Sequence, residues 1–174
     1  IFARKEDLYR GGEELFAIKP TPYPELTKTK KEISLQETLY GLYVDVFEKI
    51  EVEWPHIQWA EVQKNMETMT ERVDNFMARL SKMPKVLRTW EAYDSLKTKL
   101  ENFNTVLPLL EQLSKDSIKP RHWTELMTIT NSSFQLDDDF RLKTLLACKL
   151  EAFNEDIEEL CDGADKQLAI EQKI

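Results

Sequence analysis

The chain has 174 residues, 41% of them hydrophobic, and a formal net charge of −8. A chain of this length forms one domain or two packed subdomains, and this hydrophobic content suffices for a core. The acidic balance argues against nucleic acid as a partner, because phosphate binding requires clustered Lys and Arg. No apolar run approaches the roughly 20 residues of a membrane span, so no membrane partner is expected either.

Residues 1–24 show no sustained helical period and are predicted to form an extended or irregular N-terminal segment. Within it, the apolar run 15–18 is predicted to be a short strand or an anchor laid on a helical bundle. Prolines alternate with other residues over 20–24, and each removes a backbone donor and restricts its predecessor. The sequence therefore predicts a boundary here, followed by a helical region over 25–174.

Two helices are predicted next, over 25–51 and 59–83. Apolar residues of the first recur at helical spacing, and Trp54-Pro55 closes it. The second has the clearest period in the chain, alternating steps of three and four residues: Trp59, Val62, Met66, Met69, Val73, Phe76, Leu80 and Met83. Methionines at 66, 69, 77 and 83 are interpreted as part of a buried core stripe; the alternative is a Met-rich groove for a mobile partner.

A third helix is predicted to start at Pro84 and to be kinked or interrupted at Pro108. A short helix follows over 120–130. Asp137–Asp139 are then expected to supply the N-cap of a final helical stretch, in which Gly163 is a bend or a join. With only 4 glycines and 32% charged residues, the whole pattern predicts an all-α array of bundles with about six helices.

The sequence lacks the motifs of common nucleotide-binding and metal-binding sites. No two glycines have the spacing of a phosphate-binding loop or a dinucleotide fingerprint. No C-x-x-C or H-x-x-x-H occurs, and an EF-hand loop is excluded by its missing central glycine. The sequence therefore predicts no catalytic, cofactor-binding or metal-binding residue and no enzyme activity in this segment.

Three features have structural and functional interpretations. His122 is the one attractive base for catalysis, yet it is better explained as a structural residue at the start of a short helix, with a partner contact as the alternative. Cys148 and Cys161 are expected to be small apolar helix residues in a reducing compartment. The acidic stretch 151–162 is expected to be a solvated helix face, with docking of a basic partner as the alternative.

Many bulky residues keep an order and spacing that resemble one family. They are Leu39-Tyr40-Gly41-Leu42-Tyr43, Trp54, Trp59, Phe76, Trp90 to Leu96, Leu107 to Leu110, Arg121-His122-Trp123 and the acidic helix that closes the chain. This succession is similar to the region of dynein heavy chains where the tail runs into the linker. Leu15-Phe16 and Tyr23 to Leu26 make it most like an axonemal or ciliary heavy chain.

The resemblance implies that residues 25–174 are the N-terminal part of the dynein linker, which arches over a ring of ATPase modules. It implies a non-catalytic mechanical segment that transmits ATP-driven conformational change between motor ring and tail. ATP and Mg would bind elsewhere in the parent motor. The implied partners are the remainder of the heavy chain, other dynein subunits or neighbouring axonemal proteins, and the microtubule through the motor. The implied location is the cytoplasmic cytoskeleton, in the axoneme of a cilium or flagellum.

Two alternatives remain at this point. One is a passive helical scaffold similar to spectrin bundles, with no link to ATP; the other is a stand-alone enzyme acting through His122 or Cys148. Seven residues are expected to hold the helical region together: Trp90, Tyr93, Leu96, Leu110, Trp123, Phe140 and Leu146.

Overall fold

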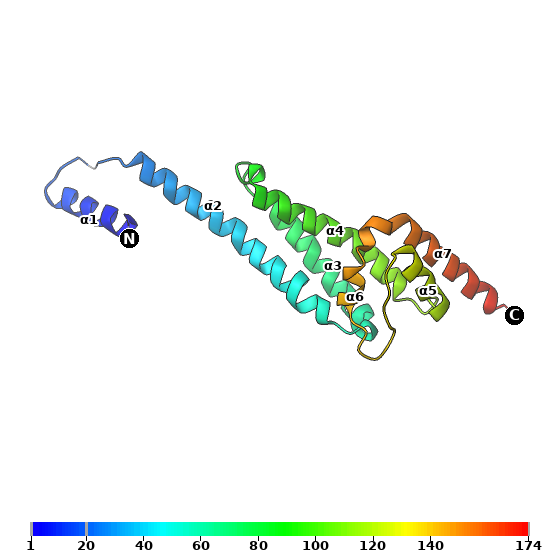
Figure 1. Ribbon diagram of the computed structural model, residues 1–174. Coiled ribbons are helices and arrows are strands. Elements are labelled where there is room, and N and C mark those ends of the chain that lie inside the picture. Colours follow the sequence, from blue (N-terminus) through cyan, green and yellow to red (C-terminus); the bar gives the residue numbers. More distant parts are fainter. Residues whose placement is uncertain (1, 20, 174) are drawn as a thin grey trace. The chain divides into compact units, whose positions relative to one another are not determined.

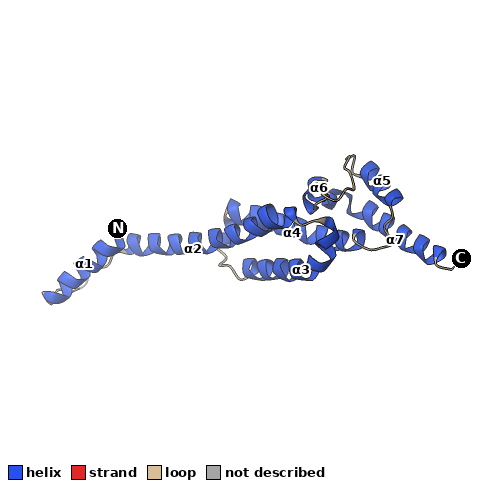
Figure 2. Cartoon of the chain, turned by 90° about the horizontal axis from the view of Figure 1, so that it is seen from below, coloured by secondary structure: helices blue, strands red, loops and turns tan. Residues whose placement is uncertain are grey.

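The predicted all-α fold is confirmed by a computed structural model that describes residues 2–19 and 21–173 (Figures 1 and 2). Within those residues there are seven α-helices, one more than the predicted six, and no β-strand. They are α1 (Phe2–Leu15), α2 (Pro24–Phe47), α3 (Trp59–Ser81), α4 (Glu91–Leu113), α5 (Pro120–Ile129), α6 (Leu142–Ala147) and α7 (Asn154–Glu171). None of these described helices combines the length and apolar character that a bilayer crossing requires.

The chain divides into two compact units, residues 1–40 and 41–174, and α2 runs from one into the other. Each unit is described by itself below. The domain boundary predicted at residue 24 stays a prediction, and Pro20 lies outside the described residues.

The prediction of an irregular N-terminal segment was wrong over Phe2–Leu15, which form α1. This helix buries a charge instead of an apolar stripe. Glu6 is buried and forms ion pairs with Arg10, at 3.3 Å, and with Lys30 of α2. Because large apolar residues of α1 such as Leu8 stay exposed, the segment has no buried apolar period for sequence reasoning to find.

The helix predicted over 25–51 is present, with its last turn altered. After Phe47 the backbone widens into a π-helical turn (Glu48–Glu53) and then tightens into a 3₁₀ turn (Trp54–His56). Pro55 lies in the first positions of that tighter turn, where its missing N–H costs no hydrogen bond. Trp54 and Pro55 are buried, so the predicted end of this segment is confirmed.

The core of residues 41–174 lies between α3 and α4, which contact each other along their lengths. The predicted seam on α3 is buried: Val62, Met66, Met69, Val73, Phe76 and Leu80. Met83, just beyond the helix, is buried too, and Met77 is half-buried. The methionines therefore belong mainly to the core, and the interpretation as a core stripe is confirmed over the groove.

The structure corrects the predicted start of the third helix and excludes one of the two effects predicted for its second proline. Residues 87–89 form a 3₁₀ turn and Trp90 is extended, so α4 begins at Glu91 and not at Pro84. The helix continues past Pro108 to Leu113, so of the predicted kink or interruption the interruption does not occur. Pro108 itself faces solvent while its neighbours Leu107 and Leu109 are buried. Packing of these neighbours stabilises the helix enough to offset the lost backbone hydrogen bond.

Asp137–Asp139 do not cap a helix, contrary to the prediction. They lie in the loop between α5 and α6, and α6 starts at Leu142 with Arg141 as its N-cap residue. The position of this loop is fixed by backbone pairing instead. Trp59 N–H donates to the Phe140 carbonyl at 2.9 Å, and Leu142 N–H donates to the Ile57 carbonyl at 3.0 Å. This antiparallel bridge joins the start of α3 to the start of α6.

The final helical stretch is also divided where no break was predicted. α6 ends at Ala147, Lys149 adopts a left-handed conformation (φ 52°), and a 3₁₀ turn over Leu150–Phe153 precedes α7. Gly163 lies inside α7 and is therefore not a join between two helices. The apolar spacing continues through the break because Leu150 is buried in the turn itself, which hides the break from a periodicity argument.

Most of the residues expected to hold the helical region together are buried: Tyr93, Leu96, Leu110, Trp123 and Phe140. Trp90 and Leu146 are half-buried. Aromatic rings form a cluster in the core near the bridge, where Trp123 meets Trp59 edge to face at a centroid distance of 5.3 Å. Phe140 and Phe134 complete the group, with ring centroids 5.8 Å and 6.1 Å from that of Trp123.

Cys148 and Cys161 are both buried free thiols in helical surroundings, as expected from the sequence. Cys148 Sγ donates to the carbonyl of Thr144 one turn earlier, at 3.2 Å. Burial, reinforced by the nearby Asp165 carboxylate, raises the pKa of Cys161 from 9.0 to about 11. The thiolate of Cys161 is therefore strongly disfavoured in the folded chain.

We expect Trp123→Ala to lower the free energy of unfolding by about 3–5 kcal/mol, the range for deleting a large buried aromatic side chain. Trp123 is only 6% exposed and contacts three other rings. Urea denaturation followed by circular dichroism measures the change. Val86→Ala is the control, because Val86 is 60% exposed and its truncation should change stability by no more than about 0.5 kcal/mol. A loss under 1 kcal/mol for Trp123→Ala would contradict the core assignment.

Cys161 should react slowly with a disulfide reagent at pH 8 when the chain is folded. A pKa of about 11 in place of 9.0 leaves about 100-fold less thiolate, which is the reactive form. In a Cys148→Ser background, the absorbance of released thiol reports Cys161 alone, before and after unfolding in urea. Between pH 9 and 11 the Cys161 thiol keeps its proton in the folded chain but loses it in the unfolded chain. The free energy of unfolding should therefore fall as the pH rises from 9 towards 11. Equal rates in both states would show that Cys161 is accessible.

Candidate functional site

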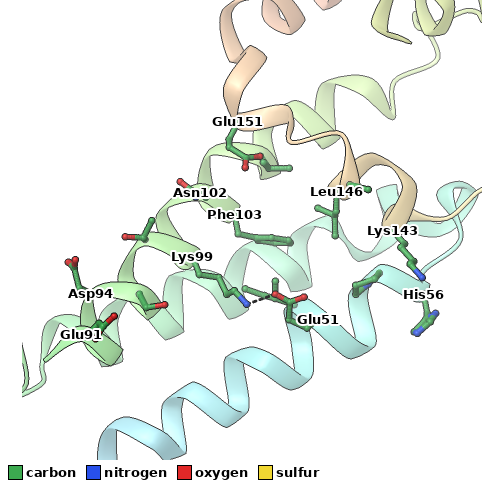
Figure 3. Close-up of a pocket in the computed structure, with 16 residues that line it drawn as sticks. Glu51, His56, Glu91, Asp94, Lys99, Asn102, Phe103, Lys143, Leu146 and Glu151 are labelled. Atoms are coloured by element: carbon green, nitrogen blue, oxygen red, sulfur yellow. Dashed lines mark hydrogen bonds and ion pairs between the residues drawn. The ribbon is translucent and has the colours of Figure 1, made fainter. Parts of the chain in front are cut away.

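An open cleft of about 770 Å³ lies within residues 41–174 (Figure 3). Three elements form its walls: the turns over 48–56, the exposed side of α4, and α6 with the start of the following turn. In Figure 3 the labelled side chains of Phe103 and Leu146 lie in the middle of the cleft, while charged groups surround them.

The floor of the cleft is apolar and fixed in place. Ile50, Phe103 and Val106 line it and are buried, and Leu146 is half-buried. Trp54 packs against Phe103 with ring centroids 5.2 Å apart. This contact holds Phe103 in one orientation, so the floor is preformed before any ligand arrives.

The rim of the cleft carries charges of both signs. Lys99 of α4 forms an ion pair with Glu51 across the cleft, and its ammonium also lies 6.0 Å from the Phe47 ring centroid. Glu91 and Asp94 lie in the first turn of α4, where the helix dipole favours carboxylates. At the other end, Lys143 and His56 lie near each other in the close-up. An apolar floor with a mixed charged rim suits binding of an amphipathic segment.

His122 is buried, and both of its ring nitrogens are engaged. Its Nδ1 accepts the backbone N–H of Lys119 at 2.9 Å, which satisfies one of the free donors at the start of α5. The proton is therefore on Nε2, which donates to Gln167 Oε1 of α7 at 3.1 Å. These bonds agree with the structural interpretation of His122, because neither nitrogen is directed at a nucleophile.

The acidic stretch 151–162 contributes to a second cavity, of about 560 Å³, between α5 and α7. Asp156, Glu159 and Asp162 line it and are exposed, as expected for a solvated face. Arg121 bonds Glu171 at 2.7 Å at the far end of α7, and this guanidinium holds the Glu171 pKa below its usual range. Among residues 2–19 and 21–173, no three His, Cys, Asp or Glu side chains gather as a metal site would require.

Sequence reasoning did not identify the cleft. Lys99 and Glu51 are 48 positions apart, and Lys143 follows much later. No spacing rule joins such residues, because the walls meet only through the packing of α4 against its neighbours. One available signal was Lys99 itself, a half-buried charged residue between the core positions Leu96 and Leu100.

Comparison with protein families matches residues 26–174 to the family described as dynein heavy chain, N-terminal region 2. The match begins two residues after the start of α2 and includes every later helix, and with it the cleft and the aromatic cluster.

Comparison with individual proteins gives the same result and shows how similar the sequences are. The chain is 38% identical over 172 residues to the dynein gamma chain of the flagellar outer arm of Chlamydomonas reinhardtii. It is 35% identical to human dynein axonemal heavy chain 8 and 34% identical to rat dynein axonemal heavy chain 5, again over 172 residues. Each comparison covers 98% of this chain but only 4–5% of the relative.

The predicted resemblance is therefore confirmed on two grounds, the family match over most of the helical region and the identity to several axonemal heavy chains. The chain belongs to the dynein heavy chain family, as a segment of its N-terminal region 2, and its relatives place it in the axonemal cytoskeleton of cilia and flagella.

Proposed function

We propose that this segment transmits conformational change between the motor ring and the tail of an axonemal dynein heavy chain. The observation that carries the proposal is the continuous apolar packing of residues 41–174. α4 contacts α3 on one side and α7 on another, and α7 in turn contacts α5. A close-packed unit of this kind moves as one body, because its interior resists deformation.

Transmission also requires a surface through which the unit contacts the rest of the heavy chain. The cleft over α4 and α6 is the surface we propose for this contact. Its floor is preformed by the Trp54–Phe103 pair, and its rim carries charges of both signs. An amphipathic segment of the remaining heavy chain would bury its apolar side chains on Phe103 and pair its charges with the rim.

In this proposal the chemical energy comes from elsewhere in the heavy chain. ATP and Mg would bind at sites outside this segment. The segment itself would act as a closely packed unit that transmits the resulting motion. Other dynein subunits, neighbouring axonemal proteins and, through the motor, the microtubule would be the remaining partners. A passive scaffold similar to spectrin is less favoured, because the chain matches a region of motor proteins over residues 26–174.

The test is Leu100→Ala in the whole heavy chain, assayed for microtubule gliding and for ATPase activity. Leu100 is fully buried in α4, and its truncation should cost about 2–5 kcal/mol of local stability. A softened unit absorbs part of the motion it should transmit. We therefore expect gliding velocity to fall by at least about half while the ATPase rate stays near the native value.

Asn104→Ala is the matched control, because Asn104 lies on the same helix with its side chain exposed. It should leave both readouts unchanged. Limited proteolysis shows whether the Leu100 variant has loosened the unit. Native gliding velocity in a heavy chain whose unit is measurably loosened would overturn the proposal.

A further inference from the structure

A third cavity, of about 500 Å³, lies on the aromatic cluster and apart from the cleft. Its walls come from the start of α3, the start of α5 and the loop before α6. Trp59, Trp123 and Phe140 provide the aromatic surface, and Pro120 and Leu136 add aliphatic surface. All of these residues belong to the unit 41–174.

The aromatic walls are held in place by backbone and ring contacts. Trp59 N–H donates to the Phe140 carbonyl, so two of the rings are attached to the same bridge. Trp123 packs edge to face on Trp59 at an interplanar angle of 86°, and Phe140 packs on both. Trp123 and Phe140 are buried, whereas Trp59 is only half-buried and offers ring surface to the cavity.

The charged side chains that line this cavity are all acidic. Asp137 and Asp138 lie on its rim and are exposed, and no described basic residue bonds either of them. The nearest basic side chain in sequence, Arg141, instead pairs with Asp139 at 3.0 Å. Asp137 accepts one backbone N–H, from Asp139 at 3.2 Å, which leaves further lone pairs on its carboxylate available.

Trp123 supplies a second, independent indication of a ligand. The side chain is more than nine-tenths buried and lines the cavity, and its indole N–H donates no hydrogen bond to the described residues. Buried indole N–H groups usually find an acceptor, and a carbonyl on a bound peptide would provide one here.

We propose that this pocket binds an arginine side chain on a basic segment of a protein partner. A guanidinium lies favourably over an indole ring, and it is less strongly hydrated than an ammonium. At the rim, its N–H groups would donate to the Asp137 and Asp138 carboxylates. The aliphatic stem would contact Leu136, and a peptide carbonyl would accept the Trp123 N–H.

The charge of the whole chain agrees with such a partner. A net charge of −8 attracts a basic segment and increases its rate of encounter with the pocket. This inference does not depend on force transmission, because it concerns a different surface from the cleft.

The experiment titrates a capped Gly-Leu-Arg-Gly peptide into the 174-residue chain and follows the four indole N–H resonances by ¹H–¹⁵N NMR. The Trp59 and Trp123 signals should shift, and those of Trp54 and Trp90 should not. Binding should weaken as NaCl is added, because exposed charges are screened. A citrulline peptide of the same shape but without charge should bind at least about tenfold more weakly.

The double variant Asp137→Asn, Asp138→Asn should lower the affinity at least about tenfold, because both charge-assisted bonds are lost. Asn at 137 keeps an oxygen for the Asp139 N–H, so the loop retains its bond. Glu71→Gln with Asp74→Asn removes the same charge from the exposed face of α3 and should leave the affinity unchanged.

Three results would overturn the proposal: no shift of Trp59 and Trp123 at millimolar peptide, equal binding of citrulline and arginine, or native affinity of the double variant. Parallel titrations with lysine and trimethyllysine peptides separate the cations. Tighter binding of either one than of arginine would reject a guanidinium ligand and assign the pocket to an ammonium group.

Discussion

The burial of α4 on two of its sides is the constraint on which the rest of residues 41–174 depends. Its apolar positions are too many for a single stripe: Tyr93, Leu96, Leu100, Phe103, Val106, Leu107, Leu109, Leu110 and Leu113. A helix with this much buried surface needs more than one neighbour, and it finds α3 on one side and α7 on another. The cleft occupies the part of α4 that these neighbours leave open, and so its position follows from their packing.

Sequence reasoning succeeded where burial and helical period coincide. The seam of α3 from Val62 to Leu80 repeats every three or four residues, and all of it is buried. The short helix α5 was found from Pro120, which begins it, and from the apolar residues that follow. In both cases one local pattern suffices, because the helix contacts its neighbours through a single continuous face.

It failed where tertiary contacts override a local signal. Pro108 predicts an interruption on its own, yet the buried leucines around it keep α4 continuous. Asp137–Asp139 resemble a helix cap, yet the backbone bridge places them in a loop beside the aromatic cavity. In α1 the helix is attached through the buried Glu6 carboxylate, a contact that no hydrophobic pattern records. Both candidate pockets join residues far apart in sequence, so neither was predictable from spacing.

The antiparallel bridge has a mechanical consequence. Two backbone hydrogen bonds connect Ile57 and Trp59 to Leu142 and Phe140, and the whole of α3, α4 and α5 lies between these points along the chain. In a polypeptide under tension, load entering from α2 can cross these bonds directly to α6 and α7. The bridge would share this load with the packed α3–α4 core, so extending the chain between α2 and α6 would have to break the two hydrogen bonds as well as loosen the core.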